Sequence, residues 1–131
     1  MTKYTVDPNS VAIQCVGILS QRLVERYNLI CPDRQVKMYP GVIKHIKKNH
    51  KEVFNKYYHC IPEIIQKPDY VGQKEQNSLE MYKFLKGNLL VAIKLDPSGY
   101  FFLSSFYELN NAEHKIKKRL KSGRIMAYSD T

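Results

Sequence analysis

The sequence has few acidic residues and no long apolar run. Twelve Asp and Glu residues stand against 21 Lys and Arg residues, which gives a formal net charge of +9 at pH 7. This excess favours polyanionic partners, with nucleic acid first and an anionic membrane surface second. No apolar run approaches the roughly 18 residues of a membrane span, and the N-terminus lacks the apolar core of a signal peptide. We therefore expect a cytoplasmic protein with a nucleic acid as its partner and no membrane partner.

Cysteine is scarce and irregularly spaced. Cys15, Cys31 and Cys60 are odd in number and show no C-x-x-C spacing, which argues against a disulfide framework and against a zinc site. We expect no metal, no other cofactor and a reduced, intracellular setting. With 131 residues the chain is long enough to bury one core without such staples. A single domain over residues 1–131 is therefore expected.

Hydrophobic spacing predicts helices in the first half of the chain. Residues 11–28 and 42–57 carry apolar side chains mostly three or four positions apart, the spacing of a buried helix face. A short extended piece over residues 36–39 separates them, and residues 61–66 are interpreted as an apolar turn. Residues 1–37 would then form an N-terminal helical extension.

The second half of the chain predicts an antiparallel meander of four strands. The run D-P-S-G at residues 96–99 is a strong hairpin signal, with proline and glycine where a tight turn uses them. The expected strands cover residues 69–72, 79–85, 89–96 and 100–109. A last helix over residues 112–121 would end at Gly123, and an edge strand over residues 124–128 would follow. The fold class is α+β, with the helices packed on a curved four-stranded sheet.

The stretch GVIKHIKKNH places two of the four histidines within a run of lysines. On a helix, His50 falls on the apolar stripe, whereas His45 lies about 60° outside it and diverges from His50 by about 140°. The simplest interpretation makes His50 a half-buried histidine bonded to the sheet and His45 part of a solvated basic face. Near an RNA backbone, however, histidine moves protons close to neutral pH while lysine holds the phosphate. The spacing i to i+5 does not match helical zinc ligands.

Lys94 is a charged residue inside an apolar strand. If the hairpin closes with Asp96 opposite Gly99, Lys94 faces Phe101, and Ser105 and Tyr107 lie on the same side of the sheet; a three-residue loop would bring Ser104 there instead. The alternative is a lysine that extends from an edge strand to solvent beside ordinary strand serines. The aromatic residues of this last strand are more typical of a core than of a base-stacking platform.

Four segments together resemble one family. KHIKKNH, CIPEIIQKPDYVG, VAIKLD and YFFLSSFYEL are similar to the phage-associated nuclease domains of the BECR fold, which groups barnase, EndoU, colicin RNases and RelE. The resemblance covers about residues 38–126 and implies a nuclease core over residues 38–128. It also implies a metal-independent ribonuclease in which helix residues meet the curved sheet. The helix would lie across the concave side, so that its imidazoles reach Lys94.

The resemblance implies a role for each matching residue. RNA would be cleaved by attack of its own 2′-hydroxyl on the adjacent phosphate, which leaves a cyclic phosphate and a 5′-hydroxyl. His45 and His50 would transfer the protons, Lys94 would stabilise the developing negative charge, and Ser105 or Tyr107 would orient the phosphate. The family often has threonine where Ser105 stands, so a hydroxyl is kept. The residues expected to bind RNA are Lys44, Lys47, Lys48, Lys51, Lys117, Lys118, Arg119 and Lys121.

Two other functions fit the same composition. A non-catalytic nucleic-acid-binding module would use the lysines but would lose nothing if His45 and His50 were changed. An adaptor could use its basic face to bind an acidic protein such as an immunity protein or antitoxin. The basic last helix fits each of these functions, and it is also explained as a solvated face.

Overall fold

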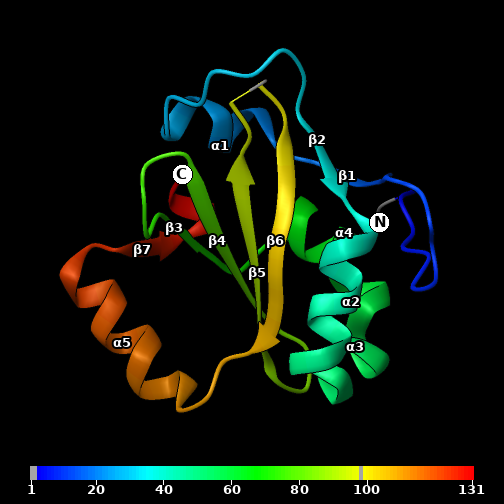
Figure 1. The fold of residues 1–131 in the computed structure, drawn as a ribbon. Coiled ribbons are helices and arrows are strands. Elements are labelled where there is room, and N and C mark those ends of the chain that lie inside the picture. Colours follow the sequence, from blue (N-terminus) through cyan, green and yellow to red (C-terminus); the bar gives the residue numbers. More distant parts are fainter. Residues whose placement is uncertain (1–2, 98) are drawn as a thin grey trace.

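The computed structural model describes residues 3–97 and 99–131, which are built around one mixed sheet (Figure 1). In the described part of the chain this sheet has seven strands in the order β1-β2-β6-β5-β4-β3-β7. The strands are β1 Gln14–Ile18, β2 Gln35–Met38, β3 Tyr70–Gly72, β4 Ser78–Phe84, β5 Asn88–Leu95, β6 Phe101–Glu108 and β7 Ile125–Ala127. The α+β class is confirmed. The four predicted strands are present as β3 to β6, and the predicted edge strand is present as β7. The expected four-stranded meander is nevertheless too small, because β1 and β2 also join the sheet.

The helices lie on both faces of the sheet. They are α1 Gln21–Arg26, α2 Pro40–Asn49, α3 Lys51–Tyr57, α4 Ile61–Gln66 and α5 Ala112–Ser122, with short 3-10 turns at Tyr58–Cys60 and Tyr128–Asp130. The main core joins the buried side chains of α1 to α4 to one sheet face, through residues such as Ile46, Phe54, Val91 and Phe106. A smaller cluster, which includes Tyr82 and Leu90, lies under α5 on the other face. We call this second face the α5 face.

The prediction of one helix over residues 11–28 is wrong. Gln14–Ile18 is strand β1, which pairs antiparallel with β2, and the helix is confined to Gln21–Arg26. The apolar residues of this segment include β-branched ones, which favour a strand, and Gly17 weakens a helix. Ser20 then caps α1, since its hydroxyl accepts a bond from the Leu23 N–H at 3.4 Å. Residues 1–37 are therefore not a helical extension.

The predicted helix over residues 42–57 is interrupted at His50. The backbone of His50 has φ −138° and ψ 47°, so α2 ends before it and α3 begins after it. Its N–H still donates to the Ile46 carbonyl at 2.7 Å, and its carbonyl accepts from the Phe54 N–H at 3.0 Å. Residues 61–66, expected as a turn, form the short helix α4. The extended piece over residues 36–39 is confirmed as β2, which pairs parallel to β6.

Helix α2 does not lie across the face that carries Lys94. Its buried residues Ile43 and Ile46 join the main core, on the opposite face of the sheet. The expected position of this helix is therefore wrong, because its apolar stripe is buried where the sheet is most apolar. None of the helices in residues 3–97 and 99–131 combines the length and the apolar character that a membrane crossing needs.

Candidate functional site

Strand register places the polar residues of the α5 face in rows. Residues paired across neighbouring strands point to the same side of a sheet. One row therefore contains Gly72, Glu80, Ala92 and Ser105. The next row contains Tyr70, Tyr82, Leu90 and Tyr107. Lys94 lies in a third row, on the other side of the Glu80 row, paired with Ser78 and Phe102.

A bulge in β6 sets which side chains share this face. The register shifts between Ala92 and Ile93, so that Ala92 pairs with Ser105 while Lys94 pairs with Phe102. The predicted pairing of Lys94 with Phe101 is therefore wrong, yet Ser105 and Tyr107 do lie on its side of the sheet. Ser104 is the extra residue of the bulge, and its hydroxyl donates to the Ala92 carbonyl at 3.1 Å.

His50 reaches the α5 face from the break between α2 and α3. Its ring stacks on the Tyr107 ring, with the ring centroids 5.5 Å apart and the planes at 29°. The side chain is half-buried, because the break turns it from the main core toward the end of β6. The break in the helix at His50 therefore brings its ring into contact with the ring of Tyr107 on β6.

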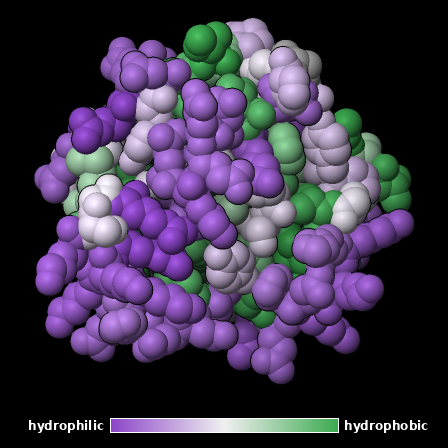
Figure 2. All heavy atoms as spheres, turned by 60° about the vertical axis from the view of Figure 1, so that its left-hand side comes forward, coloured by the Kyte–Doolittle hydropathy of each residue, from purple (hydrophilic) through white to green (hydrophobic). Residues whose placement is uncertain are grey.

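A hollow of about 560 Å³ opens beside this stack, and we call it the His50 hollow. It lies between α3, the end of β6 and α5, and its cationic groups come from Lys48, Lys51, Lys115 and Arg119. Glu52 and Glu108 also line it, so cations outnumber carboxylates there. Figure 2 shows the side of the molecule that carries α5, where hydrophilic side chains cover most of the surface.

A buried carboxylate organises two arginines on the same face. Glu80 is 6% exposed, and its Oε1 accepts bonds from Arg124 Nε at 3.2 Å and Nη2 at 2.8 Å. The Tyr82 hydroxyl also donates to this oxygen at 3.1 Å and accepts a bond from Arg119 Nη1 at 2.9 Å. We call these four residues the Glu80 network. Because Arg119 also lines the His50 hollow, the network ends at that hollow.

Two tyrosines of this face, Tyr82 and Tyr107, have raised pKa values. Burial, followed by the nearby Glu80 carboxylate, raises the pKa of Tyr82 to about 12. Burial and Glu80 also raise the pKa of Tyr107, although Arg119 and Arg124 act in the opposite direction. Both hydroxyls are therefore neutral hydrogen-bond donors at neutral pH.

The structure brings together only part of the residue set expected from sequence. His50 and Tyr107 are in contact, and Ser105 lies on the same face two positions before Tyr107. Lys94 is exposed. It lies four residues after Leu90 in β5, and Leu90 is the residue that pairs with Tyr107. This separation is about 13 Å along the strand. Lys94 instead lines a small hollow shared with Glu80 and Ser104, and a larger one shared with Val42 at the start of α2.

His45 stays on the outer side of α2. It is exposed, and its Nδ1 lies 3.2 Å from the Asn49 side-chain nitrogen. Of the lysines expected to bind RNA, Lys48 and Lys51 line the His50 hollow, as does Arg119. Lys44, Lys117, Lys118 and Lys121 are exposed on α2 or α5, and Lys47 donates to the Asn9 side chain at 3.1 Å.

Sequence reasoning missed the Glu80 network. A signal for Glu80 was present, because a carboxylate lies between Leu79 and Met81 in a strand that is otherwise largely apolar. Its partner Arg124 is 44 residues away in the chain, and nothing in the local sequence identifies it. Arg119 was expected to bind RNA, but its bond to Tyr82 was not predicted.

Comparison with known proteins identifies a family for the chain. A family model described as "phage-Barnase-EndoU-ColicinE5/D-RelE like nuclease3" matches residues 13–118. The match includes β1 and β2, which precede the motifs of the resemblance, and it ends within α5, before Arg119. No curated protein and no solved structure matches the chain. The match extends over most of the 131 residues, and the chain therefore belongs to this family of phage-Barnase-EndoU-ColicinE5/D-RelE like nucleases.

Proposed function

We propose that the protein is an endoribonuclease that cleaves RNA by attack of a 2′-hydroxyl on the adjacent phosphate, without a metal ion. The main support is the stacking of His50 on Tyr107 at the wall of a hollow that Lys115 and Arg119 also line. Cleavage needs a group that moves protons and cations that bind phosphate. Both lie together here, in a chain that belongs to a nuclease family.

In the proposed reaction His50 accepts the proton of the 2′-hydroxyl. The 2′-oxygen then forms a bond to phosphorus, and the bond between phosphorus and the 5′-oxygen breaks. The Tyr107 hydroxyl gives its proton to the leaving 5′-oxygen and regains one from the His50 imidazolium. Burial raises the pKa of Tyr107, so its hydroxyl holds a proton at neutral pH and has one to donate. The products are a 2′,3′-cyclic phosphate and a 5′-hydroxyl.

The Glu80 network would stabilise the phosphorane. Arg119 lines the hollow and is held by Tyr82, so its guanidinium is oriented before the substrate binds. Glu80 acts here as a positioning residue, because its carboxylate fixes Arg124 and Tyr82. Lys94, exposed further along the sheet, is assigned to a neighbouring backbone phosphate.

An RNase assay in EDTA tests the proposal. The wild-type protein should degrade tRNA, and His50→Ala should lower the rate roughly 10² to 10⁴-fold because it removes a proton-transfer group. The matched control is His59→Ala, which changes an exposed histidine on a 3-10 turn and should leave the rate unchanged. Equal rates for the wild type and His50→Ala would overturn the catalytic assignment.

A second variant separates the two histidines of the lysine-rich stretch. His45→Ala should retain most of the activity, since His45 is exposed and bonded to Asn49. If His45→Ala is as inactive as His50→Ala, the second proton passes through His45 and not through Tyr107. If the protein only binds nucleic acid, neither the wild type nor either histidine variant will degrade RNA.

The same hollow supports a toxin-like role in the cytoplasm. A surface in which cations outnumber carboxylates is one that a small acidic inhibitor, such as an immunity protein or antitoxin, would cover. Expression of the wild-type chain should then slow growth, and His50→Ala should restore it. Slow growth with both variants would mean that binding, and not cleavage, causes the toxicity.

A further inference from the structure

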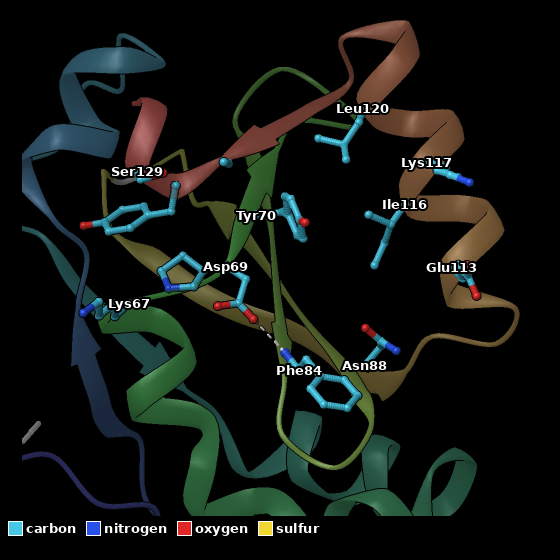
Figure 3. Close-up of a pocket in the computed structure, with 13 residues that line it drawn as sticks. Lys67, Asp69, Tyr70, Phe84, Asn88, Glu113, Ile116, Lys117, Leu120 and Ser129 are labelled. Carbon is cyan, nitrogen blue, oxygen red and sulfur yellow. Dashed lines mark hydrogen bonds between the residues drawn. The ribbon is translucent and has the colours of Figure 1, made fainter.

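A second hollow lies on the far side of α5 from the His50 hollow, and its volume is about 710 Å³ (Figure 3). Helix α5 contributes Ile116 and Leu120 to one wall. The opposite wall comes from β3 and the end of β4, with Tyr70 and Phe84. We call it the Phe84 hollow.

The Phe84 hollow combines an exposed aromatic ring with an unused amide. Phe84, at the end of β4, is 64% exposed, so most of this large apolar side chain faces solvent. Asn88 pairs with Phe84 across the β4–β5 turn and therefore lies on the same face. Within the described residues the Asn88 side-chain amide has no hydrogen-bond partner, and Figure 3 shows it beside the Phe84 ring at one end of the hollow. An aromatic face with an adjacent amide suits a flat heteroaromatic ring with polar edges.

The charges around the Phe84 hollow do not suit a phosphate inside it. Lys67 and Lys117 line it, but so do Asp69 and Glu113. Asp69 already accepts the Phe84 N–H at 2.9 Å and lies 3.8 Å from the Lys83 ammonium. Since cations and carboxylates balance, an uncharged base fits the hollow better than a phosphate.

One backbone hydrogen bond joins the linings of the two hollows just before α5. The Asn88 carbonyl accepts a bond from the Leu109 N–H at 2.8 Å. Asn88 lines the Phe84 hollow, and Leu109 lines the His50 hollow. A strand whose scissile phosphate lies at His50 can therefore pass around the N-terminal end of α5 and place a nearby base on the Phe84 side.

We propose that the Phe84 hollow binds an unpaired base of a single-stranded RNA substrate. The base stacks on Phe84, and the Asn88 amide bonds to its edge. This inference rests on the proposed function for the identity of the strand. It adds a substrate class, because a base held in a duplex cannot enter the hollow, so single-stranded RNA binds in preference to duplex RNA.

The test measures the affinity of the full chain for a short 2′-O-methyl oligoribonucleotide, which lacks the attacking hydroxyl and stays uncleaved. A second probe has the same length and charge but one abasic position at its centre. Phe84→Ala should weaken binding of the complete oligomer roughly 5- to 150-fold, the range for the loss of one base–aromatic stack. Binding of the abasic oligomer should hardly change, and Phe84→Trp should bind the complete oligomer as the wild type does.

The matched control is Ile30→Ala, which removes another exposed apolar side chain, 87% exposed and in the loop after α1. It should bind both oligomers normally. An unchanged affinity of Phe84→Ala, or an equal loss for both oligomers, would overturn the base site. If Phe84→Ala behaves as expected but no variant cleaves tRNA, the base site stands and the proposed reaction fails. If the wild type cleaves tRNA but Phe84→Ala binds the oligomer normally, the reaction stands and the base site fails.

Discussion

A buried carboxylate is costly unless charges and donors compensate it, and Glu80 shows this compensation. Its Oε1 accepts three bonds, two from Arg124 and one from Tyr82. The ion pair is partly shielded, with the Arg124 side chain 29% exposed and that of Glu80 8% exposed. Such a pair is weak support for stability but strong support for fixed geometry. Here the geometry fixes two guanidinium groups on the face where phosphate would bind.

Tyr82 links this network to alkaline stability. Its pKa is raised to about 12, whereas an unfolded tyrosine titrates at its ordinary value of 10.0. Between these values the folded state keeps a proton that the unfolded state has lost. Stability is therefore full below pH 10 and decreases as the pH rises toward 12. The two pKa units of this rise correspond to at most about 2.7 kcal/mol, at about 1.36 kcal/mol for each pKa unit.

Thermal unfolding between pH 9 and pH 12 checks this prediction. The wild-type Tm should fall steeply above pH 10, and Tyr82→Phe should show a shallower fall, because phenylalanine cannot titrate. Tyr82→Phe should also be about 1 kcal/mol less stable at neutral pH, since two hydrogen bonds are lost. Tyr57→Phe, on α3 and away from the network, serves as the control. An identical slope for all three proteins would mean that Tyr82 does not control the alkaline transition.

Single residues could be predicted from the sequence where local pattern was enough. The position of His50 on an apolar stripe marked it as half-buried, and the structure confirms this. Ser105 and Tyr107 also lie on the side of Lys94, but only because the bulge in β6 offsets the error in the assumed register. Local pattern could not reveal the break in the helix at His50, which turns its ring onto Tyr107. Nor could it pair Glu80 with Arg124, because that contact depends on how β7 returns to the sheet.

At the scale of elements, the errors arise where short segments carry both helical and strand patterns. β1 has only five residues, and its apolar residues match a helical spacing as well as an alternating one. Pairing with β2 decides the outcome, and no local signal contains that pairing. The hairpin of β5 and β6 and helix α5 were predictable, because turn residues and a glycine cap define their ends. The glycine cap is present, as Gly123 follows α5 with φ 81°.

Strand β7 can approach β3 only because residue 72 is glycine. A Cβ on Gly72 would overlap the Arg124 carbonyl oxygen and lie 2.6 Å from Ile125 Cγ2. Gly72→Ala should therefore push β7 away and cost about 1 to 3 kcal/mol of unfolding free energy. Because Arg124 directly precedes β7, the same change should weaken its bonds to Glu80 and lower RNA cleavage. Urea unfolding and the tRNA assay measure the two effects.

Gly41→Ala is the matched control for this substitution. Gly41 lies in the first turn of α2, and a Cβ there would meet nothing within 4 Å. This change should be neutral or should stabilise the protein by up to about 1 kcal/mol. Equal unfolding free energies for the two variants would show that β7 can move away from β3 without loss of stability. Gly72 would then not be needed for the close approach of these strands.

At the scale of the whole molecule, the sheet separates two kinds of surface. One face is buried under α1 to α4, whereas the α5 face is covered mainly by one basic helix and leaves hollows on either side of it. The structure thus shows that part of the positive charge lies on α5 and around the His50 hollow, which composition alone could not indicate. Sequence motifs were enough to indicate the nuclease family, since the family match confirms it. They misplaced helix α2, because its position depends on which sheet face is more apolar.

The location of the charge predicts how RNA affinity depends on salt. Each phosphate contact with a single strand contributes about 0.7 to the slope of log affinity against log salt concentration. Lys51 and Lys115 both line the His50 hollow, so the double variant Lys51→Gln, Lys115→Gln should reduce the slope by about 1.4. Titrations of the uncleavable oligomer over a range of salt concentrations measure this slope. The control pair, Lys3→Gln with Lys56→Gln, removes the same charge from exposed positions outside the hollow and should reduce the slope less. Equal reductions by both pairs would indicate that RNA binds to diffuse positive charge, and the His50 hollow would then have no special part in holding the substrate.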